Sequence, residues 1–146
     1  MRRIFLLEDD QNLVAQAQAA LATAYQFNEV LLSEGNSVLY WTSLGLTAND
    51  LPVLDLNLKS GYSGKDVLRL LEREKRKGTL NGLEQVVVAT SMKQEISPGS
   101  VNPDIALLDG FKVYGLEKGK EGGSYGSSLA AIIETIYAGI AKPLNE

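Results

Sequence analysis

Carboxylate and hydroxyl side chains stand where short apolar runs of the sequence end. Glu8, Asp9 and Asp10 directly follow the first such run. Asp55 follows a later run, and Thr90 ends another. A fold that brings these carboxylates together needs a counter-charge, because two like charges about 5 Å apart repel by roughly 3 kcal/mol at an effective dielectric near 20. Either a divalent cation or a lysine would meet this need.

A metal ion and a lysine together would make these residues suitable for phosphoryl chemistry. Oxygen ligands without imidazole or thiolate suit Mg2+, and Lys118, close behind the apolar segment 112–116, would add a second cation. A carboxylate can act as the nucleophile and form an acyl phosphate. The metal and Lys118 would neutralise the phosphoryl oxygens in the transition state. No histidine is required, because an ionised carboxylate needs no general base.

The composition excludes several other kinds of chemistry. The 146 residues contain no cysteine and no histidine, so there are no disulfides, no thiolate or imidazole metal ligands and no Ser-His-Asp triad. The net charge of −4 gives no electrostatic reason to expect nucleic-acid binding. No apolar run approaches the ~20 residues of a membrane span. We therefore expect a cytoplasmic protein of one domain, residues 1–146, without an attached output domain.

Strands and helices are expected to alternate along the chain. Continuous apolar runs, typical of strands buried on both faces, predict five strands at residues 4–7, 29–32, 51–54, 85–90 and 112–116. Helical spacing predicts helices at residues 11–25, from the turn at 61–64 to Gly78, and at 129–140, with a short one at 37–44. This alternation predicts a parallel sheet covered by helices on both faces. Ligands of such sheets bind at the carboxyl ends of the strands, where the carboxylates stand.

One stretch interrupts the pattern. The segment 91–110 contains Pro98, Gly99 and Pro103, and its first part fits no regular helix. We therefore expect an irregular segment in place of a regular fourth helix.

Three segments of the chain resemble the receiver domains of two-component response regulators, the CheY-like superfamily. They are FLLEDD at residues 5–10, VLDLNL at 53–58 and VVVATS at 86–91. The resemblance covers nearly the whole chain, with the motifs in the family's order. It implies an α/β fold with a doubly wound five-stranded parallel sheet of the flavodoxin-like, receiver type, flanked by five helices.

The resemblance also implies roles for the acidic residues. Asp55 matches the aspartate that accepts the phosphoryl group. Glu8 and Asp9 match the acidic pair that holds Mg2+, together with Asp55 and the backbone carbonyl of Asn57. Asp10 matches a variable residue of the family.

The remaining site residues match the family less completely. Thr90 matches the switch hydroxyl, and we assign Lys118 as the site lysine. Lys142 has the family's Lys-Pro dipeptide but follows the last predicted helix, so we interpret it as unrelated to the site. The family's switch aromatic normally stands three residues before the lysine, where this chain has Gly115 beside Tyr114.

Three functions remain open. The first is a single-domain receiver that accepts a phosphoryl group on Asp55 from a histidine kinase or phosphotransfer protein and signals through protein–protein contacts. It is not an enzyme in the ordinary sense, although the resemblance allows an intrinsic autophosphatase activity and a homodimer. The second is a pseudo-receiver, an unphosphorylated binding module. The third is a Mg2+-dependent phosphohydrolase of the haloacid-dehalogenase type, ranked last because Asn57 stands where that chemistry needs an acid.

Overall fold

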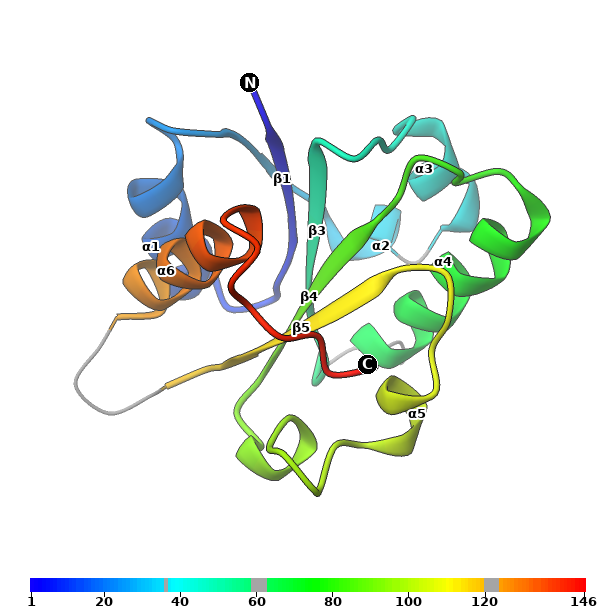
Figure 1. Ribbon diagram of the computed structural model, residues 1–146. Helices are drawn as coiled ribbons and strands as arrows, with labels where there is room; N and C mark the ends of the chain where they lie inside the picture. Colours follow the sequence, from blue (N-terminus) through cyan, green and yellow to red (C-terminus); the bar gives the residue numbers. More distant parts are fainter. Residues whose placement is uncertain (36, 59–62, 120–123) are drawn as a thin grey trace.

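Five parallel strands form one twisted sheet (Figure 1). The computed structural model describes residues 1–35, 37–58, 63–119 and 124–146. The strands are β1 (Arg3–Leu7), β2 (Gln26–Glu29), β3 (Asp50–Asp55), β4 (Gln85–Thr90) and β5 (Lys112–Glu117). Their order in the sheet is β2-β1-β3-β4-β5. This is the doubly wound, flavodoxin-like order, and the predicted fold class is confirmed.

Helices cover both faces of the sheet. α1 (Gln11–Leu21) and α6 (Tyr125–Tyr137) lie side by side on one face, and α3 (Val38–Ser43) and α4 (Gly64–Lys77) cover the other (Figure 1). The short helices are α2 (Leu32–Gly35) and α5 (Pro103–Ala106), and η1 (Lys93–Glu95) is a 3-10 turn. Within the described ranges, no helix has the length and apolar character needed to cross a membrane.

Alternate residues of each inner strand enter two separate apolar cores. Ile4 and Leu6 of β1 pack with the side chains of α1 and α6. Phe5 and Leu7 pack with those of α3 and α4. Every residue of β3 is buried. The continuous apolar runs of the sequence therefore arise because each strand is covered on both faces.

The second strand begins three residues before the predicted one. We expected a strand at residues 29–32, whereas β2 is Gln26–Glu29. β2 lies at the edge of the sheet, and its residues are half-buried or exposed. An edge strand of this kind does not need an apolar sequence, so the apolar run that follows it misled the prediction. Val30 is buried just past the strand, and Leu31 is exposed.

Two predicted helices extended too far at their carboxyl ends. α1 ends at Leu21 rather than at residue 25. α6 ends at Tyr137 rather than at residue 140, because Gly139 adopts a positive φ of 74° that terminates the helix. Ile140, which completed the predicted apolar face, is 76% exposed.

The connection between β4 and β5 is irregular, as predicted. It contains η1 and the four-residue α5, and no longer helix. Pro103 begins α5, a position that proline tolerates because its missing N–H has no partner in a helix. The predicted irregular segment in place of a regular fourth helix is therefore confirmed.

Candidate functional site

The acidic residues meet at the carboxyl ends of β1 and β3. These strands are neighbours, and Leu7 of β1 pairs in register with Leu54 of β3. Glu8 and Asp55 therefore emerge side by side. One carboxylate oxygen each of Glu8, Asp9 and Asp55 lie within 4.8 Å of one another. The structure thus brings together three of the predicted metal ligands, including the predicted phosphoryl acceptor.

Lys118 lies between two of these carboxylates. Its Nζ is 2.8 Å from Glu8 Oε1 and 3.0 Å from Asp55 Oδ2. The residue follows β5, and its backbone N–H donates to the carbonyl of Thr90 at 2.7 Å, which fixes it at the same end of the sheet. The other candidate lysine, Lys142, is exposed in the C-terminal segment.

Two carboxylates of this cluster share one ammonium. Among the described residues, Lys118 pairs with both Glu8 and Asp55, and the Asp9 carboxylate lies beside them. Apart from their ion pairs with Lys118, Glu8 Oε1 and Asp55 Oδ2 are buried without a hydrogen-bond partner among the described residues. Buried polar atoms normally have partners. Three carboxylates that converge in this way, two of them sharing one lysine, fit a hard divalent cation such as Mg2+.

Burial and the shared ammonium shift the pKa values of the cluster. Burial raises the pKa of Glu8 to about 7, a shift that Lys118 opposes and Asp55 reinforces. Burial lowers the pKa of Lys118, but its contacts with Glu8 and Asp55 outweigh this effect and raise it overall. The buried carboxylate of Glu8 therefore competes with its neighbour for one ammonium.

Backbone N–H groups orient the two buried carboxylates. Glu8 Oε2 accepts from the N–H of Asp9 at 3.0 Å and of Asp10 at 3.2 Å. Asp55 Oδ1 accepts from the N–H of Asn57 at 3.0 Å. Each carboxylate thus has one oxygen held by the backbone and the other facing Lys118. Asp10 itself caps α1 by accepting backbone N–H groups, and it lies outside the cluster.

Thr90 is fully buried at the end of β4, the strand next to β3. Its Oγ1 accepts from the side-chain amide of Asn57 at 2.9 Å and from the backbone N–H of Met92 at 3.0 Å. Its hydroxyl donates to Glu95 Oε1 at 2.9 Å. Asn57 thus links Asp55, through its backbone N–H, to Thr90, through its side-chain amide. The predicted role of its carbonyl as a metal ligand stays a prediction.

Two residues of this network were missed in the sequence. Glu95 is only 7% exposed, and Lys65 Nζ lies 2.6 Å from its Oε2. No signal marked Glu95, because the segment around it lacks periodicity. Lys65 did carry a signal: a lysine in the first turn of a helix opposes the helix dipole and calls for an acidic partner.

Gly115 stands where the family has its switch aromatic, and the space beside it is occupied. A Cβ atom on Gly115 would lie 3.0 Å from Cβ of Ile96 and 3.0 Å from Cδ1 of Leu144. Side chains from the irregular segment and from the C-terminal tail therefore fill the space beside Gly115. Tyr114 is buried against the α1 and α6 core on the opposite face, so it does not replace the aromatic.

Parts of two predicted loops lie outside the described residues. They are residues 59–62, which include part of the turn predicted at 61–64, and residues 120–123 of the glycine-rich segment.

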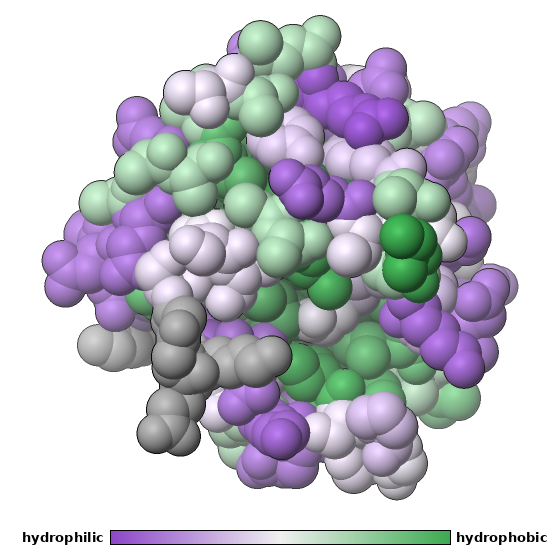
Figure 2. Space-filling view, turned by 60° about the vertical axis from the view of Figure 1, so that its left-hand side comes forward, coloured by the Kyte–Doolittle hydropathy of each residue, from purple (hydrophilic) through white to green (hydrophobic). Residues whose placement is uncertain are grey.

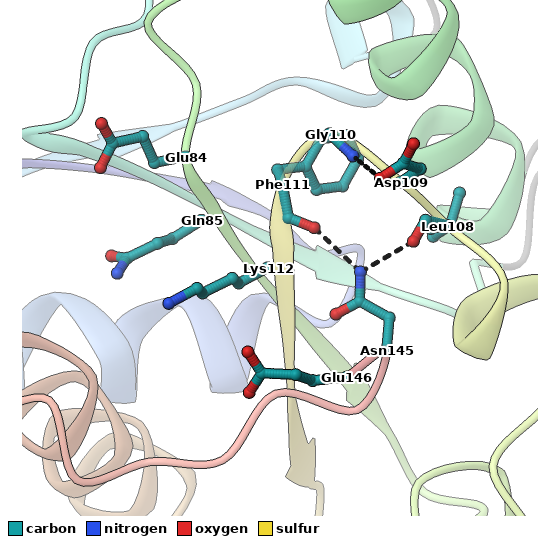
Figure 3. A pocket seen from close by; sticks show the side chains of 9 residues that line it. All are labelled: Glu84, Gln85, Leu108, Asp109, Gly110, Phe111, Lys112, Asn145 and Glu146. Carbon is teal, nitrogen blue, oxygen red and sulfur yellow. Dashed lines mark hydrogen bonds between the residues drawn. The ribbon is translucent and has the colours of Figure 1, made fainter.

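One cavity lies away from the acidic cluster. It encloses about 440 Å³ at the amino ends of β4 and β5 (Figure 3). Its lining residues are Glu84, Gln85, Leu108, Asp109, Gly110, Phe111, Lys112, Asn145 and Glu146. The Asn145 amide donates to the carbonyls of Leu108 and Phe111 at 3.0 and 2.9 Å (Figure 3). The C-terminal tail thus forms part of the cavity wall, and the cavity holds no residue predicted for the site.

A second hollow, of about 500 Å³, lies between α6, β5 and the irregular segment, with Ile96, Leu116 and Ile132 in its lining. Hydrophobic surface is visible on this side of the molecule (Figure 2).

Comparisons with known proteins support the fold. No protein-family model matches the sequence, and no curated protein matches it. Among solved structures, the signal receiver domain of a putative LuxO repressor protein from Vibrio parahaemolyticus aligns with a TM-score of 0.61 and 20% identity, over 94% of this chain and 87% of that one.

Two further structures have the same architecture. The response regulator TrrA from Thermotoga maritima, in complex with Mg2+-BeF, aligns with a TM-score of 0.59 and 16% identity over 94% of this chain and 98% of its own. The phosphorylated cyanobacterial phytochrome response regulator RcpA aligns at 0.60 with 23% identity over 97% of each chain. The chain therefore has the fold of response regulator receiver domains.

Proposed function

We propose that this chain is a response regulator receiver in which Asp55 accepts a phosphoryl group from a histidine kinase or a phosphotransfer protein. The observation that carries the proposal is the position of Lys118, whose ammonium lies 3.0 Å from Asp55 Oδ2 within the acidic cluster. The receiver fold supports it, and so do the neighbours solved with Mg2+-BeF and in phosphorylated form.

The carboxylates of Glu8, Asp9 and Asp55, with the carbonyl of Asn57, are the proposed ligands of Mg2+. The close approach of one oxygen from each of the three carboxylates, two of which share the Lys118 ammonium, supports this assignment. When bound, the ion supplies positive charge to the phosphoryl oxygens.

The chain's own residues would divide the chemistry as follows. An Asp55 carboxylate oxygen forms a bond to phosphorus while the bond from phosphorus to the donor imidazole nitrogen breaks, and the freed nitrogen keeps its electron pair. Lys118 offsets the charge of the phosphoryl oxygens. The Thr90 hydroxyl donates a hydrogen bond to one of them. Because the chain has no histidine, it is a recipient in such a relay and not a phosphohistidine donor.

We further propose that the protein signals through contacts with protein partners in the cytoplasm. A homodimer is compatible with this role. It is not an enzyme in the ordinary sense, and the phosphoryl group is lost through slow hydrolysis at the same site.

Intact-mass measurement tests the proposal. After incubation with acetyl phosphate and Mg2+, we expect the protein to gain one phosphoryl group, and Asp55→Asn to gain none. Asp10→Asn is the matched control, because asparagine also caps a helix and Asp10 lies outside the cluster; it should be phosphorylated like the parent protein. No gain in mass, or a gain that persists in Asp55→Asn, contradicts the proposal.

The pseudo-receiver is a second candidate, and one observation favours it. The space beside Gly115 is already filled by Ile96 and Leu144, which leaves no room there for a moving aromatic side chain. A Mg2+ titration separates the two functions. A phosphoryl acceptor should bind Mg2+ saturably and lose this binding in Asp9→Asn, whereas a pseudo-receiver should show no such binding. No observation favours the phosphohydrolase.

A further inference from the structure

The hydroxyl proton of Thr90 is already engaged. A threonine hydroxyl has one proton to donate, and Thr90 donates it to Glu95 Oε1 at 2.9 Å. Its contacts with Asn57 and Met92 use the hydroxyl oxygen as an acceptor. In this arrangement Thr90 has no proton left for an oxygen atom attached to Asp55.

Glu95 is a strong and well-anchored acceptor. Its carboxylate is buried, and its Oε2 lies 2.6 Å from Lys65 Nζ and 3.3 Å from Asn102 Nδ2. The backbone N–H of Asn102 also donates to the carbonyl of Glu95 at 3.0 Å. Because Lys65 lies in the first turn of α4 and Asn102 caps α5, Glu95 joins both elements to Thr90.

We propose that Glu95 is a positioning residue that holds the Thr90 hydroxyl away from Asp55 until Asp55 is phosphorylated. The inference rests on the proposed function. A phosphoryl group carries about 1.5 to 2 negative charges, more than the single charge of Glu95, and can therefore draw the Thr90 proton to itself. The Thr90–Glu95 hydrogen bond must break when this happens.

Loss of the Thr90–Glu95 hydrogen bond would change the contacts of the segment between β4 and β5. Glu95 then keeps Lys65 and Asn102 but loses its hydrogen bond to Thr90 at the end of β4. The segment from η1 to α5, whose ends Glu95 and Asn102 clasp together, becomes free to shift relative to the sheet. The irregular connection between β4 and β5 is thus the element that senses the state of Asp55.

The affinity for a phosphoryl mimic measures the strength of this restraint. The probe is beryllofluoride with Mg2+, titrated against isotope-labelled protein and followed by NMR at the amides of Thr90 and Asn102. Glu95→Gln weakens the acceptor, and Glu95→Asp keeps the charge opposite Lys65 but withdraws the carboxylate by one methylene. We expect both variants to bind the mimic about five- to tenfold more tightly than the parent.

Two controls separate this effect from a general loss of structure. Glu134→Gln removes an exposed carboxylate from α6 and should leave the affinity unchanged. In a Thr90→Val background there is no hydroxyl to restrain, so adding Glu95→Gln should have no further effect. If Glu95→Gln raises the affinity by releasing the Thr90 hydroxyl, the gain disappears in this background. A gain that has a purely structural cause persists.

The outcomes distinguish this inference from the proposed function. If the parent protein binds the mimic but Glu95→Gln and Glu95→Asp bind it equally or more weakly, the restraint is refuted and the proposed function stands. Tighter binding that persists in the Thr90→Val background also refutes it. If neither the parent nor any variant binds, the proposed function fails and the restraint with it.

Discussion

Two buried glutamates near the site have opposite pKa shifts, although each contacts a lysine. Glu8 shares Lys118 with Asp55, so burial and the neighbouring carboxylate raise its pKa to about 7. Burial also raises the pKa of Glu95, but the hydrogen bonds from Lys65 and Thr90 outweigh burial and lower it overall. A carboxylate with its own donors stays ionised, whereas one that competes for a donor favours a proton or a metal ion.

The pH dependence of stability should reveal the Glu95 contacts. Its folded pKa lies below the ordinary 4.5, so its stabilising contribution is present above about pH 4.5 and is lost as the pH falls through the folded value. Glu95→Gln should therefore cost about 1–2 kcal/mol of unfolding free energy at pH 7 and less under acidic conditions. Urea unfolding of both proteins between pH 7 and the lowest reversible pH measures the difference. A difference that stays constant or grows towards acid contradicts this.

The sequence allowed the acidic site to be predicted more completely than the network behind it. Asp55 ends a strand, and Glu8 and Lys118 directly follow strands. Parallel strands end at one edge of a sheet, so order along the chain was enough to group these residues. Glu95 follows no strand and lies in no periodic segment. Its burial depends on how an irregular connection folds back over β4, which no local pattern encodes.

At the scale of elements, α4 is fixed tightly to the carboxyl end of β3. Ser63 and Asp66 form a reciprocal capping box at its start, and Gly78 ends it with a positive φ of 86°. A Cβ atom on Gly64 would lie 2.1 Å from the carbonyl oxygen of Asp55, so the helix begins in direct backbone contact with Asp55. Glycine at this position is what permits that approach.

Gly64→Ala should therefore destabilise the protein strongly. The new methyl group would overlap the backbone of β3, and overpacking of this kind typically costs 1–3 kcal/mol or more. Gly45→Ala is the matched control: its φ of 60° is strained for alanine, but nothing lies within 4 Å of the added Cβ, so it should cost only about 1 kcal/mol. Chemical denaturation measures both. Equal losses would show that the backbone contact at Gly64 is loose.

The elements that were predicted poorly lie where burial is incomplete. The three inner strands were predicted to within a residue because both their faces are buried. β2 is half-exposed at the sheet edge, and α6 ends through the conformation of Gly139 rather than through its apolar pattern. Apolar periodicity reports burial, and it loses accuracy where an element leaves the core.

At the scale of the whole molecule, the C-terminal tail returns to the exposed edge of the sheet. The backbone N–H of Leu144 donates to the carbonyl of Val113 at 2.7 Å. The Asn145 side chain accepts from the N–H of Val113 at 3.0 Å and donates to the carbonyls of Leu108 and Phe111. The tail therefore covers the free edge of β5, where unpaired backbone groups would otherwise invite association with another chain.

Asn145→Ala should weaken this closure. The substitution leaves two carbonyls and one N–H without their partner, which we expect to cost about 1–3 kcal/mol of stability and to increase self-association through the edge of β5. Urea unfolding and sedimentation velocity measure the two effects. Asn12→Ala, on the exposed side of α1, is the control and should change neither. An unchanged stability of Asn145→Ala would mean that the tail contributes little to the fold.

The contact beside Gly115 has a practical consequence for work with this protein. Ile96, one residue from Glu95, and Leu144, two residues from the chain end, meet over the same glycine. A fluorophore attached at the C-terminus would therefore lie close to the segment that contacts Thr90 and, under the proposed function, its emission would report on the phosphorylation of Asp55. Affinity tags and surface tethers belong instead at Met1, which lies at the opposite end of the sheet from the acidic cluster (Figure 1).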